Sequence, residues 1–434
     1  MENLLNKAKQ ASDEAEVLVF NTESIPISFE NYQIQEIKSK IHKEVSLRVL
    51  KDKRIGRTCG NSFSEELVDK AVQTSQFSSP EEYHFAEQKD INYETSLYSE
   101  KVINLSLKDL VDTGKGILNK LKGKAAHIPA DLYISKTNCN IQMATTNGFS
   151  GDYAKTYYEI LLVGNTTQGA AKIYTDKMSG DYFEFEDNEI DNFINEYALA
   201  EKPMTVGTKK MPVIFTHTAL WGLLYRLALG VSGEFLEKKI TPLMNKLNEQ
   251  IFHPSVSIND DPYIPYAFGS MPFDDEGIPT SKKPIIENGV FKNFLYDLRT
   301  SSRLNAQPTG NGFKKTMHGG GIAVPPAPYP SNIYVVPGNR SLEDIIKDMP
   351  EAIVVKQALG WHSGNLTQGE FSINIGMGYL VKDGKLQGRI VDSMVSGNIY
   401  ECFKDISEIS NTSIEHAWGI YPDIVFNNMS VTGK

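Results

Sequence analysis

The chain has 434 residues, of which 44 are basic and 54 acidic, and its formal net charge is −10. This length suggests two domains rather than one ordinary hydrophobic core. The acidic balance lacks the electrostatic footprint of a nucleic-acid binder, and no apolar run approaches the ~20 residues of a membrane span, so we expect neither nucleic acid nor a membrane as a partner.

The first half of the chain, residues 1–202, mixes helical and strand patterns. Apolar residues at helical spacing predict helices over 4–15, 64–77, 107–121 and 189–199. Alternating apolar and polar residues predict strands over 17–20, 45–49 and 132–174. Asn147-Gly148 is typical of a tight hairpin turn. In the strand at 45–49, Ser46 and Arg48 alternate with valine and leucine, which predicts a half-buried strand. We interpret this half as an α+β domain.

The second half, residues 203–434, is dominated by strand patterns. The polar segment Glu201 to Lys210 carries Pro and Gly, and we interpret it as the linker. A strand over 213–215 and a helix from Thr218 with an apolar face follow. From Phe252 onward the pattern is mostly β, with two hairpin turns, Asn288-Gly289 and Asp383-Gly384. The predicted fold class is therefore α+β, with an α+β domain over 1–202 and a β-rich domain over 203–434.

Two acidic clusters precede the first of these hairpins. They are Asn259-Asp260-Asp261-Pro262 and Phe273-Asp274-Asp275-Glu276-Gly277. Their five carboxylates have the chemistry of a hard-cation site or of an acid/base pair. Aspartates beside Pro and Gly are also turn formers, because they accept from nearby backbone N–H groups while Gly277 permits a positive φ. We favour the turn, since a Ca²⁺ loop needs a longer regular run of ligands.

The order of motifs after these clusters is more specific than any one of them. A hairpin signature, a basic run and three glycine-containing segments follow in turn: Glu287 to Val290, Leu298 to Arg303, Pro308 to Asn311, Gly360 to Gly364 with Gly369 to Ser372, and Ser396 to Asn398. This order resembles the TldD/PmbA family, whose members are called modulators of DNA gyrase and metalloproteases. The resemblance runs from about Phe20 to Gly433 and implies a TldD/PmbA-like fold.

The catalytic branch of that family carries H-E-x-x-x-H on a helix, with a further thiolate ligand near the C-terminus. Two imidazoles one turn apart hold a Zn²⁺, and the Glu takes a proton from the metal-bound water. In this chain the two closest histidines, His217 and His253, are 36 residues apart, and no histidine is followed by Glu. The expected C-terminal cysteine is absent as well, because Cys402 lies earlier and has the character of a buried small hydrophobe.

The stretch Leu223 to Lys238 resembles the metal-binding helix of the family. Within it, Gly233-Glu234-Phe235 matches the Gly-acidic-Phe that follows the metal motif. Counting back from it, the two histidine positions fall on Leu224 and Leu229, and the Glu position falls on Tyr225. The resemblance therefore implies that the metal site is lost, and we expect no metal, no cofactor and no catalytic residue in this chain.

This departure matches the PmbA or TldE branch of the family. The leading hypothesis, implied by the resemblance, is a metal-ligand-less subunit that pairs with a TldD-type catalytic chain in a peptidase for short or unfolded polypeptides. Seven residues would then shape a peptide cleft or subunit interface without doing chemistry: Asp260, Asp261, Phe273, Asp274, Asp275, Glu276 and Gly277. The alternative is a homodimeric peptide-binding or regulatory protein of a gyrase or toxin–antitoxin pathway. A weaker third possibility is a peptidase that uses an unrecognised carboxylate pair, such as Asp274 with Asp275.

Cysteine usage bears on the compartment. Cys59, Cys139 and Cys402 are odd in number and far apart, which fits reduced thiols in a cytosolic protein. The start of the chain, Met1-Glu2-Asn3, shows neither a basic segment nor an apolar segment of a secretory signal. We expect a cytoplasmic location.

Overall fold

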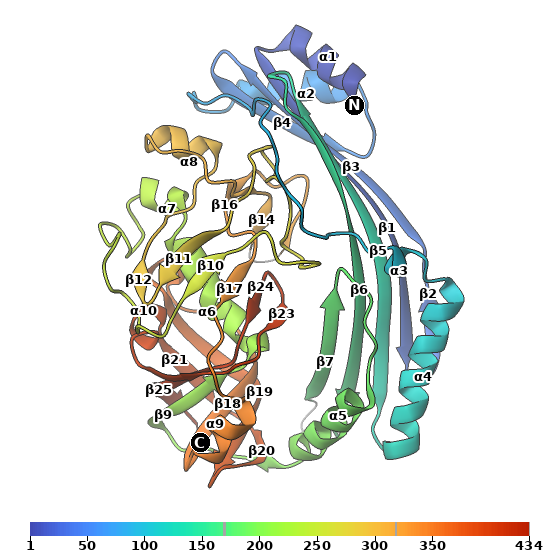
Figure 1. The fold of residues 1–434 in the computed structure, drawn as a ribbon, viewed down its shortest axis with the longest axis vertical. Coiled ribbons are helices and arrows are strands. Elements are labelled where there is room, and N and C mark those ends of the chain that lie inside the picture. Colours follow the sequence, from blue (N-terminus) through green and yellow to red (C-terminus); the bar gives the residue numbers. More distant parts are fainter. Residues whose placement is uncertain (168–170, 317–318, 434) are drawn as a thin grey trace.

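Long antiparallel strands form a curved seven-stranded sheet in the N-terminal half (Figure 1). The computed structural model describes residues 1–167, 171–316 and 319–433. In this sheet the order is β4-β3-β1-β5-β6-β7, and β2 pairs with β1. The strands are β1 Glu14–Glu30, β2 Gln33–Ile37, β3 Lys40–Lys51, β4 Arg54–Gly60, β5 Ala130–Thr145, β6 Ser150–Asn165 and β7 Lys172–Ser179.

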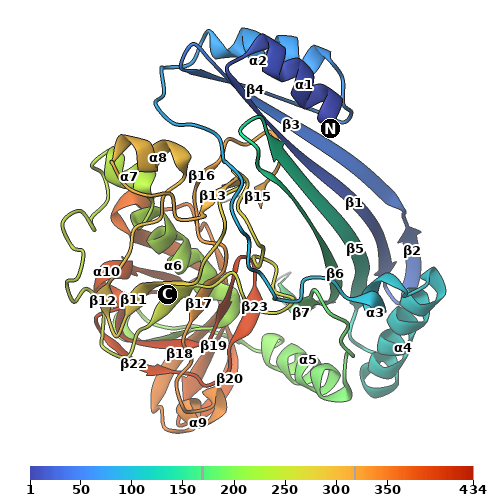
Figure 2. The ribbon, with the colours of Figure 1, turned by 45° about the horizontal axis from the view of Figure 1, so that its top comes forward.

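Helices cover one face of this sheet. They are α1 Glu2–Ala11, α2 Glu66–Ser75, α3 Glu100–Ile103, α4 Leu107–Ala125 and α5 Asp187–Ala200. Helices α1 and α2 lie at one end of the sheet and α4 at the other (Figure 2). Leu4 and Leu67 pack with Val17 at the first end, and Leu110 and Phe193 pack in the core at the second. The four helices predicted from sequence are confirmed, with ends that shift by a few residues.

The C-terminal half contains two larger sheets. An eight-stranded sheet has the order β18-β9-β25-β21-β19-β20-β8, with β22 paired to β25. Its strands are β8 Pro203–Met204, β9 Lys209–Phe215, β18 Glu351–Leu359, β19 Glu370–Lys382, β20 Lys385–Ile390, β21 Met394–Asn398, β22 Ile406–Ile409 and β25 Ile424–Thr432. A six-stranded sheet, in the order β12-β11-β10-β17-β24-β23, consists of β10 Ile258–Asp260, β11 Lys283–Glu287, β12 Val290–Phe291, β17 Ile333–Val335, β23 Ile414–His416 and β24 Gly419–Tyr421.

Smaller elements complete this half. Two short ribbons pair β13 Gly312–Phe313 with β16 Ala327–Pro328, and β14 Lys315–Thr316 with β15 Gly319–Gly320. The helices are α6 His217–Gly230, α7 Gly233–Glu237, α8 Leu298–Arg303, α9 Leu342–Lys347, α10 Ile399–Cys402 and the 3₁₀ helix η1 Leu366–Gln368.

Helix α6 lies in the core of the C-terminal half. It packs against β9 and β18 of the eight-stranded sheet and against β23 and β24 of the six-stranded one. Its buried residues lie all around the helix, as expected for a helix enclosed by protein. The stretch Leu223 to Lys238, interpreted from sequence as one helix, is two helices in the structure. Helix α6 ends at Gly230, and Ser232 caps α7 by accepting from the N–H of Glu234.

The α+β class predicted from sequence is confirmed, with a mixed N-terminal half and a strand-rich C-terminal half. All three predicted hairpins form. Asn147-Gly148 joins β5 to β6, with Gly148 at a φ of 101°. The other two each use two residues with positive φ, namely Asn288 at 50° with Gly289 at 78°, and Asp383 at 49° with Gly384 at 73°. Part of the proposed linker is strand, because β8 pairs with β20 and β9 begins at Lys209. The division at residue 202 stays a prediction. Among the described residues, no helix combines the length and apolar character that a membrane crossing requires.

Candidate functional site

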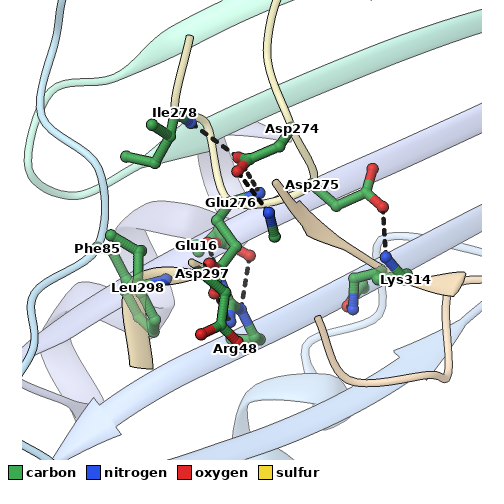
Figure 3. Close-up of polar contacts among 12 residues, drawn as sticks. Glu16, Arg48, Phe85, Asp274, Asp275, Glu276, Ile278, Asp297, Leu298 and Lys314 are labelled. Atoms are coloured by element: carbon green, nitrogen blue, oxygen red, sulfur yellow. Dashed lines mark hydrogen bonds and ion pairs between the residues drawn. The ribbon is translucent and has the colours of Figure 1, made fainter. Parts of the chain in front are cut away.

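A buried arginine joins the two halves of the chain (Figure 3). Arg48 on β3 donates from Nε and Nη2 to the two carboxylate oxygens of Glu16 on β1, at 2.8 and 2.5 Å. Its Nη1 donates to Oε1 of Glu276, in the C-terminal half, at 2.8 Å. The arginine side chain is 3% exposed and each glutamate side chain 1%. The second oxygen of Glu276 accepts from the backbone N–H of Leu298 at 2.7 Å, so every partner in this triad is hydrogen-bonded.

Strand register places the first two members of the triad. Glu16 and Arg48 are directly opposite each other in the β1–β3 pair, so both point to the same face of the sheet. That face is covered by the C-terminal half, where Phe273 and Ile278 pack against Leu18. The prediction of a half-buried strand at 45–49 is therefore wrong, because both of its faces are buried.

Opposing effects set the ionisation of the triad. Burial raises the pKa of Glu16, and the neighbouring Arg48 lowers it only in part. Burial also acts to lower the pKa of Arg48, but the charges of Glu16 and Glu276 hold it above its usual range. The arginine is therefore a fixed cation between two acids.

The second acidic cluster forms a turn that Asp274 organises. Its Oδ1 accepts from the backbone N–H groups of Glu276 at 3.0 Å and Ile278 at 2.9 Å, and its Oδ2 accepts from that of Gly312 at 2.8 Å. Burial and the charge of Glu276 raise the pKa of Asp274, against the lowering effect of the three N–H donors. This is the turn chemistry that the sequence predicted, and it uses both oxygens of Asp274 for structure.

The rest of this cluster is also fixed by neighbours. Asp275 accepts from the backbone N–H of Lys314 at 2.7 Å, and burial raises its pKa. Phe273 packs edge-to-face on the rings of Phe149 and Tyr153, with centroids 5.2 and 5.1 Å away. Gly277 has φ of +78°, as its place in the turn requires.

The first acidic cluster lies apart from the second in the hydrogen-bond network. Asp260 is fully buried and accepts from the side chains of Asn311 and Lys283 and from the backbone of Ser331. Asp261 forms an ion pair with Lys282 at 2.7 Å. No hydrogen bond within the described part of the chain joins a carboxylate of one cluster to the other, so the clusters do not form one carboxylate site.

A pocket of about 630 Å³ opens beside the triad, and both Arg48 and Glu276 line it. Asp297 and Tyr83 line it as well. The remaining members of the two acidic clusters are not among its lining residues. The sequence had indicated Glu276 as a cleft residue, but it did not single out Arg48, Asp297 or Tyr83. The one available signal concerned Arg48, a charged residue among the valines and leucines of the strand at 45–49.

The three positions that the resemblance assigns to the family's metal motif are packed in the core. Leu224 is fully buried in α6, and Leu229 packs against the same core. Tyr225 lies among aromatic rings, with centroids 6.1 Å from that of Tyr329 and 6.2 Å from that of Trp418. Across residues 1–167, 171–316 and 319–433, no three His, Cys, Asp or Glu side chains are placed to hold a metal ion. These residues do not fit a zinc site, because no nitrogen, oxygen or thiolate set converges on α6.

Comparison with known proteins identifies the family. The model of the PmbA/TldA metallopeptidase C-terminal domain matches residues 208–433, more than half of the chain, and that of domain 1 matches residues 15–75. The chain belongs to the TldD/PmbA family. An uncharacterised protein of Methanocaldococcus jannaschii is 26% identical to this family member, over 98% of each chain.

Solved structures of other TldD/PmbA proteins are similar throughout. TldE from Thermococcus kodakarensis superposes with a TM-score of 0.88 at 25% identity, covering 100% of both chains. A putative modulator of a DNA gyrase from Thermotoga maritima superposes with a TM-score of 0.85 at 25% identity, covering 99% of both. The TldD/PmbA fold predicted from the order of the motifs is confirmed.

Proposed function

We propose that this TldD/PmbA chain is a TldE-type subunit without catalytic residues, which works with a TldD-type chain that holds the metal. Together they would cleave short or unfolded polypeptides, and this chain would form part of the substrate cleft. The observation that carries the proposal is the apolar packing of Leu224, Tyr225 and Leu229 in a chain that keeps the full family fold.

The surroundings of α6 support a structural role for this helix rather than a metal-binding one. An isolated charge in a dry core costs many kcal/mol unless ligands or counter-charges surround it. Leu224 and Leu229 carry no metal-ligating atom, and no three His, Cys, Asp or Glu side chains of the described residues are placed to hold a metal ion. In this proposal the hydrolytic chemistry therefore comes from the partner.

The seven acidic-cluster residues act in this proposal by shaping the cleft or the subunit interface. Glu276 contributes directly, because it lines the pocket beside Arg48. Asp274 contributes through the turn that presents Glu276. In the described part of the chain, β7 is an edge strand of the long N-terminal sheet, and it offers backbone groups for strand addition by an extended peptide. The described cysteines are all free thiols, which fits the cytoplasm, and we propose that location.

The test compares the chain alone with the chain co-expressed with the TldD-type protein of the same genome. Zinc content is measured by mass spectrometry, and cleavage is measured on unfolded casein and short fluorogenic peptides. We expect neither zinc nor cleavage from the chain alone, and both from the co-purified complex. A complex whose partner carries Glu→Gln in its metal motif is the matched control for activity.

Two outcomes would contradict the proposal. About one tightly bound zinc per isolated chain, with cleavage, would make this chain a peptidase itself. Failure to bind any TldD-type chain, with a stable homodimer by light scattering, would favour the regulatory alternative.

A further inference from the structure

The pocket beside the triad is bounded by segments from both halves of the chain. Strand β4 and the end of α2 form one wall, α7 and α8 form another, and residues 325–327 form a third. Its lining residues are Arg48, Ile55, Arg57, Thr74, Phe77, Ser78, Glu81, Tyr83, Glu234, Glu276, Asp297, Arg299, Pro325, Pro326 and Ala327. The volume of about 630 Å³ lies within the range of small-ligand sites.

Asp297 brings an unused acceptor to this pocket. The residue is 1% exposed and caps α8, where its Oδ1 accepts from the N–H and the hydroxyl of Thr300 at 2.7 and 2.6 Å. Its other oxygen, Oδ2, accepts no hydrogen bond from any described residue. Because Asp297 lines the pocket, this oxygen is open to a ligand that enters it.

Tyr83 brings a second unused polar atom. The residue is 9% exposed, and its ring packs edge-on against Phe85. Its hydroxyl forms no hydrogen bond with the described part of the chain. Burial raises the pKa of this hydroxyl, and the charge of Asp297, which lines the same pocket, adds to that effect. A ligand that reaches them meets one carboxylate oxygen and one phenol oxygen together.

Two of the three arginines that line the pocket are engaged by other acids, whereas Arg57, exposed on β4, forms no ion pair within the described part of the chain. Arg48 is held by Glu16 and Glu276, as described above. Arg299 forms ion pairs with Glu234 at 3.7 Å and with Glu237 at 3.6 Å. Among the described residues, neither arginine forms an ion pair with Asp297. When it is ionised, Asp297 is therefore a negative charge without an ion-pair partner among the described residues.

Apolar groups lie nearer the opening. Phe77 is 84% exposed, which is unusual for so large an apolar side chain. Ile55, Pro325, Pro326 and Ala327 line the same pocket. A ligand that fits the pocket thus has a polar tip for the floor and an apolar stem for the walls.

We propose that this pocket binds a primary ammonium group carried on an apolar stem, as in a lysine side chain or the amino terminus of a polypeptide. The ammonium donates to Oδ2 of Asp297 and to the hydroxyl oxygen of Tyr83. The stem lies along Phe77 and the prolines. A bare metal ion is disfavoured because fewer than three ligating side chains converge here. An anion is disfavoured because the four acids that line the pocket outnumber its three arginines. The proposal concerns the isolated chain and holds with or without a catalytic partner.

Titration supports this assignment. Burial, and then the charge of Glu276, raise the pKa of Asp297 to about 7. The other charged or titratable groups that line the pocket are Arg48, Arg57, Glu81, Tyr83, Glu234, Glu276 and Arg299. Since an ammonium pairs with the ionised carboxylate, the affinity for a lysine side chain, which stays protonated throughout, should rise about tenfold between pH 6 and pH 8. An amino terminus loses its own proton near pH 8, so its affinity should rise less.

The experiment is calorimetric titration of the full chain at pH 8. One probe is Nα-acetyl-lysine N-methylamide, whose ammonium is on the side chain. The other is leucyl-alanine amide, whose ammonium is the amino terminus. The acetylated form of each probe is its control. We expect binding of at least one free amine and no binding of its acetylated form, and the stronger of the two amines identifies the source.

Variants link the binding to the pocket. Asp297→Asn keeps a helix cap, since Asn caps as well as Asp, and we expect it to lower affinity at least tenfold and to abolish the pH dependence. Tyr83→Phe keeps the ring and should lower affinity several-fold. Asp191→Asn removes an exposed aspartate on α5 and should change nothing. The proposal is overturned if neither amine binds, if the acetylated probes bind equally, if Asp297→Asn binds as the native chain does, or if inorganic phosphate binds in the amines' place.

Discussion

Replacement of Arg48 by Met tests the account of the buried triad. The methionine fills a similar apolar volume but leaves Glu16 and Glu276 buried without a cation. Removal of one partner from a buried ion pair typically costs about 3–5 kcal/mol. Three charge-assisted hydrogen bonds are lost here. We therefore expect the free energy of unfolding to fall by about 3–5 kcal/mol at pH 7.5.

Protonation supplies a second readout. Burial already raises the pKa of Glu16 with Arg48 in place, and loss of the arginine raises it further. A carboxyl whose pKa is raised in the folded state takes up a proton on folding. The contribution of that carboxyl to the free energy of unfolding is fully present below its pKa in the unfolded chain, and it is lost as the pH rises through its pKa in the folded protein. The deficit of Arg48→Met should thus be smaller at pH 5 than at pH 7.5.

Urea unfolding, followed by circular dichroism and by tryptophan fluorescence, measures both effects. All three tryptophans lie in the C-terminal half, at 221, 361 and 418, so the two signals report on different parts of the chain. Lys108→Ala, which breaks an ion pair whose lysine is 83% exposed, is the control and should leave the midpoint unchanged. A loss below about 1 kcal/mol for Arg48→Met, the range of exposed pairs, would refute the buried triad. A deficit that is independent of pH would refute its electrostatic origin.

Three further changes probe the packing around the site. Leu224→Ala should lower the free energy of unfolding in urea by about 2–5 kcal/mol, because the leucine is fully buried. Leu107→Ala, on the surface, is the control and should change it little. Equal losses would contradict the packing of α6. Gly277→Ala should cost about 1–2 kcal/mol by thermal unfolding, because alanine disfavours the φ of +78°, and an unchanged melting temperature would argue against this turn. Arg226→Met removes the donors to the carbonyls of Trp361 and neighbouring residues, so tryptophan emission should shift to longer wavelength and acrylamide quenching should increase. Unchanged emission would show that the segment around Trp361 and Ser363 is held by other contacts.

Local sequence patterns were sufficient to predict the main helices and strands and the turns. Asn288-Gly289 forms the predicted hairpin because few residue pairs other than Asn-Gly adopt two positive φ values cheaply. Asp274 and Gly277 form the predicted turn for the same kind of reason. Oδ1 of Asp274 accepts from the backbone N–H groups of Glu276 and Ile278, which are only two and four residues further along the chain. The apolar character of α6 was equally visible at Leu224 and Leu229.

Local sequence patterns could not predict the contacts between segments that are far apart in the chain. Arg48 looked like a solvent-facing residue of a half-buried strand, because nothing nearby in sequence reveals that Glu276 lies against it. The same limit applies to Asp297, whose free oxygen matters only because Tyr83 and the wall at 325–327 enclose it.

By itself, the sequence determined the fold class, the turns and the absence of closely spaced histidines, since each depends on residue type and short spacing. Only the tertiary structure decided which charges are buried and which polar atoms are left without a partner. Those properties depend on how the long sheet and the C-terminal half exclude water between them, at residues more than two hundred positions apart, such as Arg48 and Glu276.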